Sequence, residues 1–373
     1  MTSDELNVVG VVDEPFKPLA DVFAHALGAQ NGGGAALTIV LEGKRVVDLY
    51  GGTYRTDSLQ FLFSVTKALT AICAAVAMEA GQLDLDEPIS EYWPEMRKAS
   101  TRGITPRMIL SHRSGLASME NRLSMEALLA HEDEEAIALQ EPYWEPGSRH
   151  GYHSFTFGTL MNSIFQRRLG YGVGDFLRLA ISKPLQLDLW IGTPKEEMPR
   201  VIPIESPSTR YYRPRRFRGT QVPDWASGLR RESEHPFYNE PAVLAADWPA
   251  VSGVGSARAL AAIMSATLDG RLLTREGLGL MIATQSRGMD EVLGILDHFG
   301  SGLMRPFPLL PFIGSESYGH DGGGGCVAFA DREFQVAVGW TSNVIPRVMG
   351  ASPGFALLLG AIRECLMLRT LET

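Results

Sequence analysis

The sequence has little cysteine and no excess of positive charge. Its 373 residues include only three cysteines, Cys73, Cys326 and Cys365, which lie far apart in the chain. An odd number of scattered cysteines does not suit a disulfide framework, so we expect reduced thiols and a cytoplasmic location. The formal net charge of −9 argues against nucleic acid as a main partner.

Long apolar runs are also missing. No stretch approaches the roughly 18 apolar residues that a transmembrane helix needs. The first 16 residues are polar and acidic, without the apolar core of a signal peptide, and there are no repeats. We therefore expect a globular protein away from membranes, with one large or two closely packed domains. The sequence leaves the oligomeric state open.

The most informative stretch is the start of a helix predicted from Ala68 to Ala80. This helix is apolar on nearly every face and is expected to be buried. Ser64 and Lys67 precede it, three residues apart, a spacing that places two side chains on one helix face. Such a pair supplies a nucleophile with a base beside it, next to N–H groups that can hold an oxyanion. Taken alone, the tetrapeptide fits a helix cap with a snorkelling lysine equally well.

Strand patterns occur near both ends of the chain, and helical patterns fill its middle. This order predicts an α/β fold whose antiparallel sheet is built from both termini and flanked by helices. We expect a sheet domain from residues 1–80 and 250–373, an inserted mainly helical domain at 81–249, and an active site between them. Helices are predicted at 13–27, 106–112, 126–139, 154–169, 174–185, 256–268, 274–284 and 353–368, and strands at 36–41, 45–49, 326–329 and 334–340.

An arginine-rich segment at residues 206–241 stands out from its surroundings. Arginines alternate there with Tyr211, Tyr212 and Trp225. Arginine among aromatic rings suits an anionic or planar substrate. The same composition fits a long solvated loop on an acidic protein, and this simpler interpretation is the one we favour.

Two further motifs strengthen the interpretation of Ser64 and Lys67. Residues 146–154 form a turn that presents Tyr152 ahead of a helix, and residues 318–325 form a glycine-rich edge that leads into a strand. With these motifs the chain resembles the serine β-lactamase and penicillin-binding-protein superfamily, and within it most closely the class VIII carboxylesterases. The resemblance covers nearly the whole chain and includes residues 46–52, 83–88, 109–116 and 183–185.

The resemblance implies a role for each motif residue. It assigns Ser64 as the nucleophile that forms an acyl-enzyme, Lys67 as the adjacent base, and Tyr152 as the residue that accepts and donates protons. A phenol needs nearby cations to act as a base, because its usual pKa is near 10, and Lys67 is the candidate. The backbone N–H groups of Ser64 and Gly323 match the oxyanion hole. No cofactor and no metal are implied.

Departures from the β-lactamase pattern indicate the substrate class. His153 and Ser154 follow Tyr152 where β-lactamases have Tyr-x-Asn, so an amide that binds the lactam side chain is missing. His320, Asp321 and Gly322 replace Lys-Thr-Gly, so a fixed cation becomes a titratable imidazole. These five residues are the candidates for substrate binding. Asp321 fits three roles equally: orienting His320, binding a substrate amine, or facing solvent.

Other histidines need a simpler interpretation. His112 and Ser114 resemble members of a catalytic triad, yet they match a structural turn of the superfamily. His150 and His153 have a spacing that can bind a metal, but no third ligand is evident in the sequence, so we expect no metal there.

We therefore predict a serine hydrolase that acts on small to medium carboxylic esters. The alternative is acyl transfer, in which an alcohol or amine instead of water resolves the same acyl-enzyme. A D-amino-acid peptidase, a β-lactamase and an acyl-binding sensor are less favoured. The expected partners are a small ester or acyl donor and, for transfer, an acceptor; the acyl group itself is not evident from the sequence.

Overall fold

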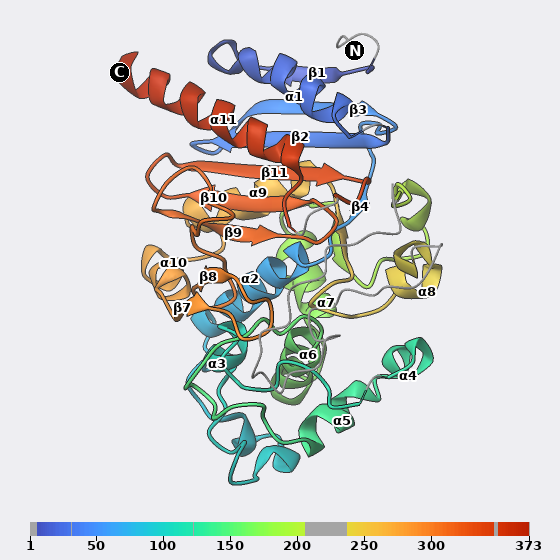
Figure 1. Ribbon diagram of the computed structural model, residues 1–373, viewed down its shortest axis with the longest axis vertical. Coiled ribbons are helices and arrows are strands. Elements are labelled where there is room, and N and C mark those ends of the chain that lie inside the picture. Colours follow the sequence, from blue (N-terminus) through green and yellow to red (C-terminus); the bar gives the residue numbers. More distant parts are fainter. Residues whose placement is uncertain (1–5, 31, 122, 206–236, 347–349, 373) are drawn as a thin grey trace.

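The structure of the protein is a computed structural model. It describes residues 6–30, 32–121, 123–205, 237–346 and 350–372. The fold is a mixed α/β fold with a large antiparallel sheet towards one end and mostly helices towards the other (Figure 1). The arginine-rich segment 206–241 falls almost entirely outside the described residues, so its predicted role is not addressed.

The large sheet joins strands from the two ends of the chain. Its order is β1-β3-β2-β11-β10-β9, and all neighbours are antiparallel. The predicted sheet built from both termini is therefore confirmed. The strands are β1 Val9–Val12, β2 Gly34–Leu41, β3 Lys44–Gly52, β9 Ser317–Asp321, β10 Val327–Asp331 and β11 Val336–Ser342.

The helices surround this sheet and fill the other end of the molecule. Short 3-10 turns lie at Glu14–Phe16, Ile89–Glu91, Pro94–Met96, Met198–Arg200 and Phe237–Asn239, and a π-helical turn lies at Leu177–Ser182. The α-helices are α1 Pro18–Gly28, α2 Val65–Glu79, α3 Pro106–Leu110, α4 Met125–Leu129, α5 Asp133–Leu139, α6 Thr156–Leu169, α7 Val173–Phe176, α8 Pro241–Leu244, α9 Ala257–Leu268, α10 Arg275–Ile282 and α11 Pro353–Glu372.

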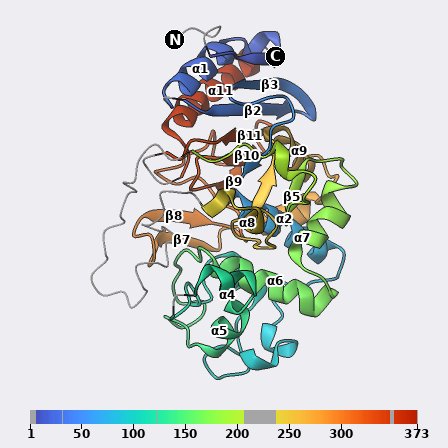
Figure 2. The same ribbon diagram turned by 90° about the vertical axis from the view of Figure 1, so that its right-hand side faces the viewer.

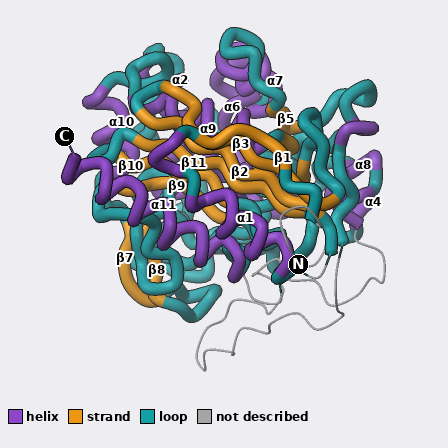
Figure 3. The backbone as a smooth tube through the Cα atoms, turned by 90° about the horizontal axis from the view of Figure 1, so that it is seen from above, coloured by secondary structure: helices purple, strands orange, loops and turns teal. Residues whose placement is uncertain are grey.

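The two faces of the sheet are covered differently. Helices α1 and α11 lie side by side over one face, and α9 lies on the other (Figure 3). Trp340 of β11 packs edge-on against Phe23 of α1 and also contacts Phe355 of α11. Its neighbour Gly339 points the opposite way, where a Cβ would lie 2.1 Å from the carbonyl oxygen of Ala257. A small residue is therefore required where α9 crosses the sheet.

Helix α2 lies at the junction of the sheet and the helical part. It contacts the edge strand β9 on one side and α6 and α7 on the other (Figure 2). Residues Val65 to Ala75 of α2 are all buried, as the apolar sequence predicts. The residue boundaries that we expect for two domains stay a prediction.

Two small sheets complete the description. The first has the order β4-β6-β5 and the second is the hairpin of β7 and β8. The sequence did not indicate these strands, because each has only two to four residues and three of them, β6, β7 and β8, contain glycine or charged residues. Their bounds are β4 Gln60–Phe61, β5 Leu189–Ile191, β6 Gly253–Gly255, β7 Ser286–Met289 and β8 Leu296–Phe299.

One predicted helix is broken in the structure. The acidic segment 126–139 forms α4 and α5, separated at His131, whose φ of 59° is left-handed and cannot continue a helix. The single helix predicted there was wrong. No helix among the described residues is long and apolar enough to cross a membrane. The three cysteines are buried and free, in agreement with the prediction of reduced thiols.

Candidate active site

Ser64 lies at the entrance to α2, directly after a strained turn. The chain leaves β4 and reaches Phe63, whose φ of 50° is uncommon for a residue with a side chain. Ser64 follows with helical backbone angles, immediately before Val65 begins α2. Such local strain persists only where surrounding packing enforces it, and it is common at functional sites. The turn places the Ser64 hydroxyl at the positive end of the helix dipole.

Lys67 is fully buried one helical turn further on. Its Nζ lies 3.2 Å from Ser64 Oγ, 2.8 Å from the carbonyl oxygen of Ser154 and 3.1 Å from that of Ala250. Three oxygen atoms from separate segments therefore hold Nζ in one position. The side chain is thus fixed beside the candidate nucleophile, and a snorkelling lysine does not describe it. The role of Ala250 could not be predicted from the sequence, because every residue carries a backbone carbonyl.

The surroundings of Lys67 favour its neutral form. Burial lowers the pKa of Lys67 well below its usual value of 10.5, and the nearby charge of Asp321 partly opposes this shift. The Nζ also lies 4.8 Å from the centre of the Tyr152 ring. A lysine with a lowered pKa can accept a proton from an adjacent hydroxyl.

Tyr152 is brought to Ser64 by the turn before α6. Burial raises the pKa of Tyr152 above its usual range, although a hydrogen bond with Ser64 acts in the opposite direction. From the sequence we expected Lys67 to lower the pKa of Tyr152, but in the structure burial dominates and the pKa is raised. The phenol therefore stays protonated near neutral pH and is suited to donate a proton, so Lys67 is the stronger candidate for the base.

His320, at the end of β9, is buried close to Lys67 and Tyr152. Its ring lies 6.2 Å from that of Tyr152, between centres. Burial and then the charge of Lys67 lower the pKa of His320 to about 3, against a weaker opposing effect of its backbone hydrogen bond. Its Nδ1–H donates to the carbonyl oxygen of Asp321 over 2.6 Å, and Nε2 finds no partner among the described residues. The imidazole is neutral and offers no fixed cation.

The carboxylate of Asp321 does not orient the His320 ring. Asp321 Oδ2 accepts a hydrogen bond from the backbone N–H of Ala351 at 3.1 Å, while Oδ1 lies 3.9 Å from His320 Nδ1. The side chain is only 15% exposed. Burial raises the pKa of Asp321 to about 6. Of the three roles open from the sequence, ring orientation and full solvent exposure are thus not what the geometry shows.

The glycine run passes directly beside the Ser64 turn. A Cβ on Gly322 would lie 2.5 Å from the carbonyl oxygen of Leu62 and 3.4 Å from the nitrogen of Ser64, so only glycine fits there. Gly323 faces open space instead. Within the described part of the chain, the backbone N–H groups of Ser64 and Gly323 donate to no acceptor. They are available as donors to a developing oxyanion.

His153 and Ser154 lie behind the site rather than in it. His153 is buried, and its Nε2 lies 2.7 Å from Ser114 Oγ while Nδ1 lies 2.6 Å from the Gly151 carbonyl oxygen. Both ring nitrogens are therefore engaged within the protein. Ser154 contributes its carbonyl oxygen to Lys67. His112 is buried as well, and its Nδ1 accepts a hydrogen bond from the His153 N–H, which fits a structural role for this turn.

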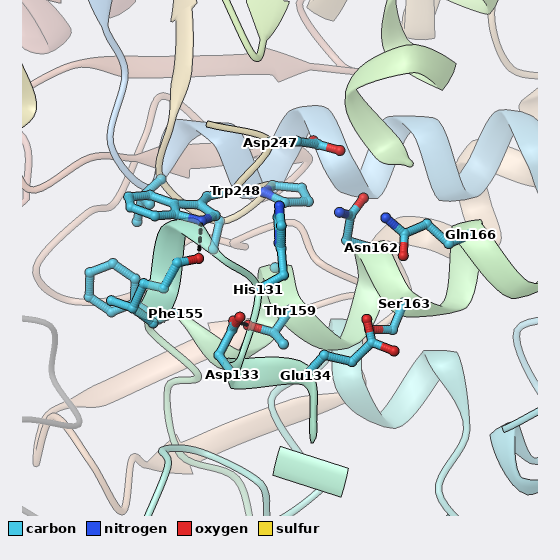
Figure 4. A pocket seen from close by; sticks show the side chains of 15 residues that line it. His131, Asp133, Glu134, Phe155, Thr159, Asn162, Ser163, Gln166, Asp247 and Trp248 are labelled. Atoms are coloured by element: carbon cyan, nitrogen blue, oxygen red, sulfur yellow. Dashed lines mark hydrogen bonds between the residues drawn. The ribbon is translucent and has the colours of Figure 1, made fainter. Parts of the chain in front are cut away.

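A cavity of about 230 Å³ lies along α6. Figure 4 shows Asp133 and Asp247 on opposite sides of it, with His131 between them and Trp248 and Phe155 together on one side. Ala250, whose carbonyl accepts from Lys67, also lines this cavity. Burial raises the pKa of Asp133 and of Asp247. The lining mixes carboxyl groups with the apolar side chains of Phe155 and Trp248, and no sequence motif indicated this cavity.

Comparison with known proteins agrees with this geometry. The family model described as Beta-lactamase matches residues 19–357. The chain belongs to the Beta-lactamase family. It is therefore an enzyme of the β-lactamase-like superfamily, a group of serine hydrolases, and the resemblance that the motifs indicated is confirmed.

Individual known proteins are similar to the chain over nearly its full length. A crystal structure of a family VIII carboxylesterase has a TM-score of 0.86 at 25% identity and covers 96% of this chain and 99% of that one. A penicillin-binding-protein homologue from Caulobacter crescentus has a TM-score of 0.84 at 30% identity, with 96% and 99% covered. The esterase/β-lactamase LipL of Mycobacterium tuberculosis is 28% identical over 96% of this chain and 88% of its own length.

Proposed function

We propose that this protein hydrolyses small to medium carboxylic esters through an acyl-enzyme on Ser64. The observation that carries the proposal is the buried Lys67 Nζ at 3.2 Å from Ser64 Oγ, in surroundings that favour the neutral amine. A nucleophile with an adjacent base is the arrangement that serine acyl transfer requires. The esterases among the relatives support the same class of substrate.

The geometry suggests the course of the reaction. Ser64 Oγ attacks the ester carbonyl carbon while its proton passes to Lys67, and the oxyanion is held by the N–H groups of Ser64 and Gly323. The carbonyl re-forms as the bond to the alcohol oxygen breaks, and a proton from Lys67, delivered directly or through the Tyr152 hydroxyl, completes the released alcohol. Water then attacks the carbonyl carbon of the acyl-enzyme and loses a proton to Lys67. The bond to Ser64 Oγ breaks, Lys67 returns that proton to Ser64 Oγ, and the acid is released.

The environment of His320 supports an ester over a β-lactam. A lactam carboxylate is bound best by a fixed positive charge, whereas burial lowers the pKa of His320 to about 3 and leaves it neutral. An ester without a carboxylate does not need that cation. We therefore expect esters to be turned over much faster than β-lactams.

Turnover of p-nitrophenyl acetate and butyrate tests the proposal, with intact-mass spectrometry run in parallel. Wild type and Ser64→Ala are compared, and Ser148→Ala, an exposed serine, is the matched control. Release of p-nitrophenolate that disappears only in Ser64→Ala supports the proposal. Equal turnover by wild type and Ser64→Ala would contradict it.

The same experiment separates hydrolysis from acyl transfer. Alcohols and amines are added as acceptors, and the mass of the protein is followed with time. An acyl adduct that turns over in water supports hydrolysis. An adduct that persists in water but clears with an acceptor would make acyl transfer the function, and one that never clears would indicate a sensor.

A further inference from the structure

Three titratable side chains meet in a buried cluster outside the site described above. His150 Nε2 lies 2.8 Å from Asp297 Oδ1, and one donor atom each of His150, Asp290 and Asp297 lies within 4.8 Å of the others. The three residues are 9%, 1% and 3% exposed. His150 precedes Tyr152 by two residues. The carboxylates come from the hairpin of β7 and β8, more than 130 residues away in the sequence.

The two carboxyl groups have few donors from the rest of the protein, and they interact with each other through a side-chain hydrogen bond that requires a proton on one of them. Asp290 Oδ1 accepts the backbone N–H groups of Val292 at 2.7 Å and Leu293 at 2.6 Å. The remaining Oδ2 atoms of Asp290 and Asp297 are both buried and have no other hydrogen-bond partner in the part of the chain that the structure describes. Buried acceptors without donors are costly, and two neighbouring carboxylates also repel each other.

The basic side chains next to the cluster in sequence pair with other groups and not with these carboxylates. Arg149, next to His150, makes its ion pair with Glu291 at 3.8 Å, and its side chain is 63% exposed. His153, which the sequence spacing pairs with His150, is held by Ser114 and the Gly151 carbonyl instead. The cluster therefore needs a bound cation or a shared proton.

We propose that His150, Asp290 and Asp297 bind a divalent transition-metal ion of the zinc or manganese type. One imidazole nitrogen and two carboxylates form a donor set that such ions accept. Ligand atoms about 2.0–2.2 Å from a metal lie roughly 3–4 Å from one another, so the observed spacing needs only small side-chain movements. Calcium and magnesium prefer all-oxygen sites and fit less well.

The ion joins two segments that position Tyr152. The carbonyl oxygen of His150 already accepts a hydrogen bond from the Glu291 N–H at 3.1 Å, which ties the hairpin to the Tyr152 turn. A metal bond from the His150 side chain adds a second tie at the same point. The role is structural, because the ion has no path to the ester in the mechanism above. This inference does not depend on the substrate of Ser64.

Metal titration of the full-length protein tests the inference. The protein is treated with a chelator, dialysed, and titrated with ZnCl₂ or MnCl₂ in an isothermal calorimeter, with the melting temperature measured in parallel. We expect one ion per chain and a rise in melting temperature, because a ligand that binds only the native state stabilises it. Removal of a residue that only supports a metal ligand typically lowers metal affinity roughly 10–100-fold. Asp297→Asn removes a ligand itself, so we expect a larger loss of affinity. Glu291→Gln, a neighbouring carboxylate outside the cluster, is the matched control and should bind like wild type.

Further measurements keep the inference falsifiable. Asp290→Asn gives a second variant that can still accept the backbone N–H groups through its amide oxygen, so it decides the question if Asp297→Asn does not fold. Titration with CoCl₂ should give the visible bands of nitrogen and oxygen ligands. Absence of saturable binding to wild type would overturn the inference and leave a shared proton between the carboxylates. Unchanged binding by a folded variant, or thiolate bands from cobalt, would overturn it as well.

Discussion

Lys67 Nζ lies 3.2 Å from Ser64 Oγ, and the same nitrogen donates to backbone carbonyls from two distant segments, at Ser154 and Ala250. The helical spacing fixes the first contact, and tertiary packing fixes the other two. Desolvation then lowers the pKa of the amine. The proposed nucleophile and its candidate base are therefore brought together by one helix turn, while the pKa of that base depends on the rest of the fold.

Lys67→Arg should abolish most of the esterase activity. Arginine is always positively charged and cannot give up its proton, so it cannot serve as the base. We expect kcat to fall by about 10²–10⁴-fold, the usual contribution of a positioned base. The fall in kcat is measured by steady-state hydrolysis of p-nitrophenyl butyrate.

Lys183→Arg, an exposed lysine, is the matched control and should retain full activity. If the larger guanidinium disturbs the near-UV circular dichroism, Lys67→Met gives a variant without charge. A folded Lys67 variant with wild-type kcat would show that another group is the base.

Removal of the Asp321 charge should shift the pH profile of kcat/KM to lower pH. The negative charge of Asp321 raises the pKa of Lys67. In Asp321→Asn that influence is lost, so Lys67 becomes neutral at lower pH and the rising limb of activity moves with it. The effect should be largest above pH 6, because the pKa of Asp321 itself is about 6.

The dependence of kcat/KM on pH is measured from pH 4.5 to 9.5 with p-nitrophenyl acetate. The midpoint of the rising limb in wild type is the reference for the variant. Asp175→Asn, at an exposed position on α7, should leave the profile in place. A limb that stays fixed or moves to higher pH in Asp321→Asn would contradict the assignment of Lys67 as the base.

Ser114→Ala should destabilise the protein. The Ser114 hydroxyl is the partner of the buried His153 Nε2 at 2.7 Å, and its removal leaves that nitrogen unpaired. An unsatisfied buried polar group costs about 1–3 kcal/mol. Urea unfolding measures the loss, with Ser148→Ala on the surface as control. Equal midpoints for wild type and Ser114→Ala would mean that His153 finds another partner.

Local sequence signals predicted the elements that have clear ends and a clear period. The helix expected at 256–268 is α9, and Ser256 caps it by accepting the Ala259 N–H. The hairpin expected at 36–49 is β2 and β3, with positive φ at Glu42 and Gly43 in its turn. In such elements, capping, turn chemistry and periodicity all point to the same structure.

The features of the fold and site that could not be predicted from the sequence depend on contacts between distant residues. The hairpin of β7 and β8 contains Gly288, Asp297 and His298, which lack a strand pattern. The lysine contact to Ala250 is made by a carbonyl that any residue carries. His150 appeared beside His153 in sequence, yet in three dimensions it faces Asp297 instead. A linear pattern cannot report which side of a turn each side chain takes.

Gly324→Ala should disturb the Ser64 turn, whereas Gly323→Ala should not. A Cβ on Gly324 would lie 2.1 Å from the ring of Phe63, while one on Gly323 would meet no atom within 4 Å. The Phe63 ring cannot easily retreat, because it packs edge-on against Phe61 at 5.1 Å and Tyr238 at 4.6 Å, between ring centres.

Overpacking at such a site typically costs about 1–3 kcal/mol. We therefore expect Gly324→Ala to lower the urea midpoint and to slow labelling of Ser64 by a fluorophosphonate, since Phe63 sets the backbone of the next residue. In Gly323→Ala the midpoint should equal that of wild type. If Gly324→Ala keeps both the midpoint and the labelling rate, the left-handed Phe63 turn does not depend on the glycine run for its position.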